Sequence, residues 1–120
     1  MLRMNAEDFE KVVEKAIDDI PPEIFDRIDN VMVVVEDEPT EEELRELGME
    51  PEELLFGLSQ GVALPERGID YANVLPDRVV IYRLPLLEAC INRRELHREI
   101  RATVIHEIGH YFGFDEWQLP

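Results

Sequence analysis

Apolar side chains recur at helical spacing near the start of the chain. After Asn5, which has the side chain of a helix N-cap, apolar positions repeat every three or four residues as far as about Ile20. Pro21 and Pro22 then end the pattern, because the residue before a proline disfavours the helical conformation. The sequence predicts an N-terminal helix after Asn5 and a short helical turn around residues 22–29. The apolar stripe consists of Phe9, Val12, Val13, Ala16, Ile17 and Ile20.

Two runs rich in β-branched residues predict buried strands. Residues 31–35 are Val-Met-Val-Val-Val, and residues 77–83 place Val, Val, Ile and Tyr between charged ends. Residues 54–64 mix Leu, Phe and Val with two glycines, which favours a strand or a bulged edge over a helix. We therefore predict an α+β fold, with a small mixed sheet packed against the N-terminal helix and a C-terminal helix.

Two short helices are predicted between these elements. Thr40 and Glu43 have the spacing of a capping box inside an acidic segment, residues 36–53, which carries ten acidic side chains and one basic side chain. Charge runs usually face water, so we interpret this segment as a solvated, mobile excursion. The alternative is a flap that attracts a cation or a substrate. A second short helix is expected from residue 85 to about residue 91.

Composition and charge narrow the possible partners. The 120 residues fit one domain, residues 1–120, and 28 acidic against 12 basic side chains give a net charge of −16. This charge disfavours nucleic acid and anionic membranes and favours cationic partners. Cys90 is the only cysteine, interpreted as a buried structural thiol, and no segment resembles a signal peptide or a membrane span. We expect an acidic, cytoplasmic protein.

The last predicted helix carries the motif that can support chemistry. Asn92 and Glu95 have the spacing of an N-cap and N3 pair, and the helix is expected over residues 93–112. It contains His106-Glu-Ile-Gly-His110, the H-E-x-x-H pattern. Residues four apart lie one above the other on a helix, so both imidazoles can reach one metal ion, with Glu107 beside the water that the metal would hold.

A helical wheel tests whether these histidines belong to the core. His106 and His110 share one side with Glu99 and Thr103, opposite the apolar residues, so metal ligation is favoured over core packing or a merely exposed face. Glu99 and Thr103 are candidates for hydrogen bonds to the ligand imidazoles, or for solvated helix polarity alone. His97 falls on the apolar side and is interpreted as a capped or packed residue, not as a metal ligand. The apolar positions are Ile100, Val104, Ile108 and Tyr111.

A catalytic zinc usually takes three protein ligands and leaves one position to water. After the second histidine, Gly113 can adopt a left-handed turn at little cost and bring the following residues back toward the metal. Glu116 or Asp115 would then complete a site of two histidines and one carboxylate. The residues alone do not decide whether Glu116 or Asp115 is the third ligand.

The segment from His106 to Glu116 resembles the extended H-E-x-x-H-x-x-G-x-x-H/D signature of metzincin-like zinc peptidases. It is similar in particular to small bacterial zincin-like proteins described as minimal metalloproteases. The resemblance implies Zn²⁺ as cofactor, His106, His110 and Glu116 as its ligands, Glu107 as catalytic base and Gly113 as the turn residue. The sequence departs from the larger metzincins at Glu116, where they have histidine or aspartate.

These observations favour a zinc metallopeptidase. Glu107 would take a proton from the attacking water and return it to the leaving amine. An edge strand, with residues 58–64 as the candidate, would pair with a peptide or protein substrate, which the charge predicts to be cationic. Tyr82 and Tyr71 are possible oxyanion donors, but a packed or half-exposed role is preferred for each.

Two other functions remain open from the sequence. One is a non-catalytic or metal-free interaction module that keeps the zincin scaffold. The other is a structural or regulatory protein in which four arginines of the last helix bind an acidic partner such as RNA, although pairing between the basic region 67–101, with seven of the 12 basic residues, and the acidic region 36–53 is preferred. The basic residues concerned are Arg93, Arg94, Arg98 and Arg101.

Overall fold

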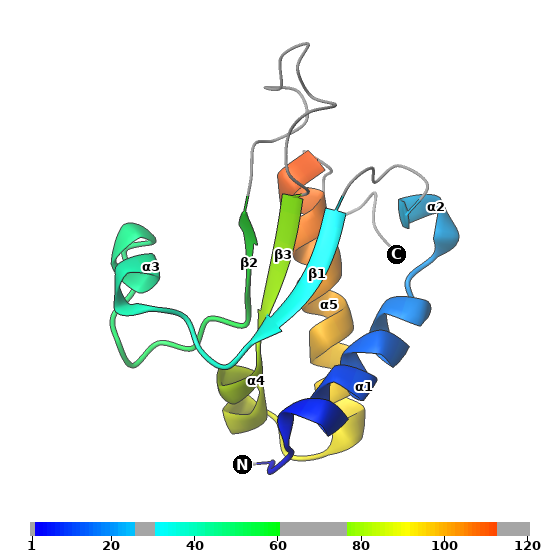
Figure 1. Ribbon diagram of the computed structural model, residues 1–120, viewed down its shortest axis with the longest axis horizontal. Coiled ribbons are helices and arrows are strands. Elements are labelled where there is room, and N and C mark those ends of the chain that lie inside the picture. Colours follow the sequence, from blue (N-terminus) through cyan, green and yellow to red (C-terminus); the bar gives the residue numbers. More distant parts are fainter. Residues whose placement is uncertain (1, 26–30, 61–76, 113–120) are drawn as a thin grey trace.

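The computed structural model describes residues 2–25, 31–60 and 77–112, and for residues 24, 25, 31, 77 and 109–112 it describes the backbone alone. Figure 1 shows the strands side by side, with the long C-terminal helix running behind them. The elements in chain order are α1 (Ala6–Asp18), α2 (Pro22–Phe25), β1 (Val31–Glu36), α3 (Glu41–Glu46), β2 (Gly57–Gln60), β3 (Asp77–Tyr82), α4 (Arg83–Ala89) and α5 (Arg93–Phe112).

The sheet is mixed, as the sequence predicted. Its strand order is β1-β3-β2, with β1 parallel and β2 antiparallel to the central strand. Within the described part of the chain, β2 is therefore an edge strand. It occupies only Gly57–Gln60 of the strand predicted over residues 54–64; residues 54–56 lie outside it, and residues 61–64 lie outside the described chain.

Helix α1 begins where the sequence placed it, because the Asp8 N–H donates to Asn5 Oδ1 at 2.8 Å. It ends at Asp18, two residues before the predicted end, and Ile20 follows in a tight turn whose N–H donates to the Ile17 carbonyl at 3.0 Å. Ile20 remains buried in the core beyond the helix. Apolar periodicity therefore extended past the last helical residue.

The main core lies between α1, α5 and one face of the sheet. Side chains alternate between the faces of a strand, and Val79 and Ile81 of β3 point into this core. Helix α5 meets them with Ile100, Val104 and Ile108, all fully or almost fully buried. The motif helix is therefore held by the core along the side opposite its polar residues.

Val80 and Tyr82 of β3 point to the other face of the sheet and are also fully buried. The acidic segment covers part of that face through α3, whose Leu44 is buried. The predicted capping box is confirmed: the Glu43 N–H donates to Thr40 Oγ1 at 3.0 Å, and the Thr40 N–H donates to Glu43 Oε1 at 2.9 Å. The segment is exposed along much of its length but is fastened to the sheet.

Helix α4 begins at Arg83, two residues before the predicted start. Pro85 lies in its first turn, where no intrahelical N–H partner is needed, so the proline does not mark the helix start. Cys90 follows the helix and is fully buried, as predicted, and burial, with Glu95 adding to the effect, raises the pKa of its thiol. None of the helices in the described stretches combines the length and apolar character that crossing a bilayer requires.

Candidate active site

Helix α5 presents the H-E-x-x-H motif near the end of its described length. The Glu95 N–H donates to Asn92 Oδ1 at 2.8 Å, which confirms the predicted N-cap. The predicted two-sided character is also confirmed, because His106 is exposed whereas Val104 and Ile108 are buried. The His110 backbone follows one helical turn later. The helix therefore keeps His106 outside the core.

Glu107 is half-buried and is held by one residue of strand β2. The Ser59 N–H donates to Glu107 Oε1 at 2.9 Å, and Ser59 Oγ lies 2.7 Å from the same oxygen. Ser59 Oγ also lies 3.3 Å from the Glu107 carbonyl oxygen, a longer contact. Among the described residues, no donor reaches the second carboxylate oxygen, Oε2. Within this part of the chain, Ser59 anchors one oxygen of Glu107 and the other oxygen has no donor.

The antiparallel ladder explains why the Ser59 N–H faces the motif helix. The Tyr82 N–H donates to the Phe56 carbonyl at 3.0 Å, so alternate residues of this segment turn their backbone groups toward β3. Ser59 stands at an intervening position, opposite Val79, and its N–H points away from β3 toward the side of β2 where the described residues form no strand. Glu107 lies on that side.

Gly57 allows α5 to approach β2 closely enough for this contact. A Cβ atom at residue 57 would lie 2.6 Å from Thr103 Cγ2 and 3.1 Å from the Val80 carbonyl oxygen. Any larger residue would therefore push the helix and the strand apart. No local pattern indicated this approach, or Ser59 as a site residue, because Ser59 and Glu107 are 48 positions apart.

His97 and Thr103 of α5 have partners outside the motif. His97 is half-buried, and its Nε2 lies 2.7 Å from Asp19 Oδ2 just beyond the end of α1. Thr103 Oγ1 donates to the Glu99 carbonyl oxygen at 2.7 Å, so the Thr103 proton is used within the helix and not on a histidine. Glu99 is half-buried on the same helix.

Tyr82 has the packed role that the sequence analysis preferred. It is fully buried, and its hydroxyl donates to Glu43 Oε2 at 3.3 Å. Burial raises the pKa of Tyr82 far above its ordinary value, and the negative charge of Glu43 raises it further. A buried hydroxyl committed to Glu43 is not an oxyanion donor at the motif. Tyr71, the other candidate, lies outside the described residues.

The donor set of the motif has the chemistry of a zinc site. Two imidazoles one helical turn apart with a nearby carboxylate form a common ligand set for catalytic zinc. His106 is exposed, but residues 2–25, 31–60 and 77–112 contain no group of three histidine, cysteine or acidic side chains placed to hold a metal. Gly113, Asp115 and Glu116 lie outside the described residues, so the third ligand stays a prediction.

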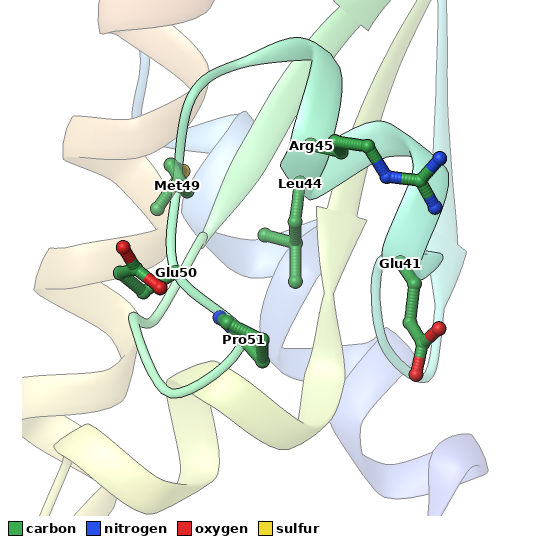
Figure 2. A pocket seen from close by; sticks show the side chains of 6 residues that line it. All are labelled: Glu41, Leu44, Arg45, Met49, Glu50 and Pro51. Carbon is green, nitrogen blue, oxygen red and sulfur yellow. The ribbon is translucent and has the colours of Figure 1, made fainter.

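A separate hollow lies beside α3. Figure 2 shows Leu44 and Met49 within it and charged side chains around them, and its volume is about 350 Å³. None of its lining residues belongs to the motif helix, so we do not assign it to the active site. The lining residues are Glu41, Leu44, Arg45, Met49, Glu50 and Pro51.

Some basic side chains do pair with the acidic segment. Arg83 Nε lies 3.0 Å from Asp37 Oδ1, and Arg78 lies 3.4 Å from Glu36. On α5, Arg101 Nε donates to the Asp19 carbonyl at 3.4 Å, whereas Arg93, Arg94 and Arg98 are exposed. Intramolecular pairing therefore accounts for two basic residues of β3 and α4, but not for the exposed arginines of α5.

Sequence and structure comparisons agree with this architecture, an α+β domain of metallopeptidase type. The profile of the family described as zincin-like metallopeptidase matches residues 28–120. The chain belongs to this family, which typically binds zinc. No curated protein matches the sequence. Among solved structures, a conserved hypothetical protein from Thermo thermophilus is similar, with a TM-score of 0.54 and 20% identity over 89% of this chain and 92% of that one. That likeness supports the fold alone.

Proposed function

We propose that this protein is a zinc-dependent hydrolase that cleaves peptide bonds, with Glu107 as its general base. The observation that carries the proposal is the state of the Glu107 carboxylate. Oε1 is fixed by two donors from Ser59, while no donor among the described residues reaches Oε2, and the neighbouring His106 is exposed. A carboxylate with one fixed and one open oxygen is suited to proton transfer.

The ligand set proposed for zinc is His106, His110 and Glu116, with Asp115 as the alternative to Glu116. Bound there, the metal would supply Lewis acidity toward a peptide carbonyl and a water molecule. Glu107 would take the proton of the attacking water at Oε2 and return it to the leaving amine. The Ser59 donors would keep the carboxylate in place during both transfers.

The substrate proposed is an extended, cationic peptide. Strand β2 is an edge of the described sheet and lies beside the motif, and extended peptides bind such edges by backbone pairing. A peptide there would pair with outward backbone groups other than the Ser59 N–H, which Glu107 holds. The net charge of −16 attracts positively charged chains and repels polyanions. A protein or peptide segment carrying Lys or Arg is therefore preferred over a nucleic acid.

Zinc content and peptide cleavage test the proposal together. We expect one zinc ion per chain by elemental analysis, its loss in His106→Ala, and its retention in Glu107→Gln and in the control His97→Ala. Glu107→Gln should reduce cleavage of a quenched-fluorescent peptide library by about 10²- to 10⁴-fold. Failure to bind zinc at micromolar supply would overturn the proposal. Zinc binding without Glu107-dependent cleavage would favour the non-catalytic module instead.

A further inference from the structure

We propose that Ser59 is a positioning residue for the catalytic base: it holds the Glu107 carboxylate by one oxygen and thereby orients the other for proton transfer. This inference deepens the proposed function and rests on it. It assigns a role in the reaction to a residue of strand β2, outside the H-E-x-x-H motif.

Two donors from a single residue converge on Glu107 Oε1. The backbone N–H of Ser59 donates at 2.9 Å, and its hydroxyl lies 2.7 Å away. Two hydrogen bonds to one oxygen, from donors in different directions, restrict rotation about the last bond of the glutamate side chain. They also leave Oε2 in a defined direction without consuming it as an acceptor.

The support beneath Ser59 is regular secondary structure. On one side, β2 is hydrogen-bonded to the central strand, where Ser59 stands opposite Val79. On the other side, Gly57 packs against Thr103 of the motif helix so closely that a Cβ atom would collide there. The strand and the helix that carry the two partners are thus fixed relative to each other, as a positioned catalytic group requires.

The rest of the described strand cannot take over this role. Leu58 and Gln60 alternate with Ser59, so their side chains turn to the opposite face, and Gln60 Nε2 donates to Glu43 at 3.3 Å. Gly57 shares the face of Ser59 but has no side chain. Ser59 is also the only serine of the chain, so the hydroxyl contact depends on this one position.

Removing the hydroxyl should therefore impair the chemical step and not substrate or metal binding. In Ser59→Ala the backbone N–H still reaches Oε1, but the carboxylate regains freedom to rotate. We expect kcat to fall about ten-fold, with KM and zinc affinity within about two-fold of the native values. Ser59→Thr keeps a hydroxyl at the same atom and should restore most of kcat.

The matched control is Thr103→Val. It removes a hydroxyl from the same helix–strand contact, but that hydroxyl donates to the Glu99 carbonyl and does not contact Glu107. Its kcat should stay within about two-fold of the native value. All variants would be assayed at saturating zinc on the best-cleaved member of the peptide library.

A second readout does not depend on catalysis. A double-mutant cycle of Ser59→Ala and Glu107→Ala, by urea unfolding at saturating zinc, should give a coupling of about ten-fold in the unfolding equilibrium constant. No coupling would overturn the inference outright. Coupling with unchanged kcat in Ser59→Ala would reduce the contact to a structural one and overturn the positioning role alone. Absence of Glu107-dependent cleavage in the native protein would overturn the proposed function, and this role with it.

Discussion

Glu43 on α3 and Glu107 on α5 both accept hydrogen bonds from β2, Glu43 from Gln60 and Glu107 from the adjacent Ser59. Glu43 is satisfied on both oxygens. Its Oε1 accepts the Thr40 N–H, and its Oε2 accepts from Gln60 and from the Tyr82 hydroxyl. Glu107 is satisfied on one oxygen only among the described residues. A saturated carboxylate fastens two elements together, whereas a half-satisfied one keeps an acceptor for chemistry.

The helices that carry the two glutamates differ in length and in how much apolar packing holds them. Glu43 belongs to a helix of six residues whose buried residue is Leu44. Glu107 belongs to a helix of 20 residues that is backed by buried apolar side chains along its length. The long helix can hold a reactive group in place by packing, and the short helix depends on polar fastening to remain on the sheet.

The largest contrast is expected between Glu107→Gln and Glu43→Gln. Glu107→Gln should remove about 10²- to 10⁴-fold of peptide cleavage and change the free energy of unfolding by less than about 1 kcal/mol. Glu43→Gln should do the reverse, with cleavage within about two-fold and a loss of about 1 kcal/mol of stability. Cleavage rates and urea midpoints of both variants measure this. Equal losses of peptide cleavage in Glu107→Gln and Glu43→Gln would contradict a catalytic role for Glu107 and a structural role for Glu43.

Packing beneath the two glutamates should also differ. Ile108→Ala deletes an almost fully buried side chain next to Glu107 and should cost about 3 kcal/mol of unfolding free energy. Leu44→Ala acts at the less enclosed site next to Glu43 and should cost about 2 kcal/mol. Thermal and urea unfolding of the pair measures both. A larger loss for Leu44→Ala would show that α3 is a central part of the fold.

Tyr82 adds a pH dependence to the Glu43 region. Its pKa in the folded protein is raised by burial and then by Glu43, whereas in the unfolded chain it is about 10. Above about pH 10 the unfolded state has lost a proton that the folded state keeps, so stability should fall as pH rises past that value. Urea midpoints between about pH 8 and pH 11 should show a shallower decline for Tyr82→Phe. Equal declines of the urea midpoint with pH in the native protein and in Tyr82→Phe would contradict a raised pKa of Tyr82 as the cause.

Thr40→Ala tests the N-cap of α3 and should have the smallest effect on stability. It removes the hydroxyl that caps the Glu43 N–H and should cost about 1 kcal/mol or less. Thr40→Ser keeps the cap and serves as its control. Peptide cleavage should be unchanged in both variants. A loss of activity in Thr40→Ala alone would connect α3 to the active site.

Local patterns predicted the elements because their causes are local. Asn5, Thr40 and Asn92 cap helices through bonds that span three residues, and all three caps are present. The predictions were wrong at some ends of helices and strands. Apolar spacing continued past the last turn of α1, Pro85 did not mark the start of α4, and glycine-containing residues 54–64 contain only four described strand residues.

The class of fold and the motif helix follow from sequence pattern alone. Spacing placed His106 and His110 on one side of a helix with the apolar residues opposite, because helical geometry is the same in any protein. Two features depend instead on tertiary contacts: the hydrogen bonds from Ser59 to Glu107, and those by which Glu43 holds α3 on the sheet. Ser59 and Tyr82 acquire their partners from the register of β2 on β3 and from the close approach that Gly57 permits. These relations join residues tens of positions apart, which no local pattern encodes.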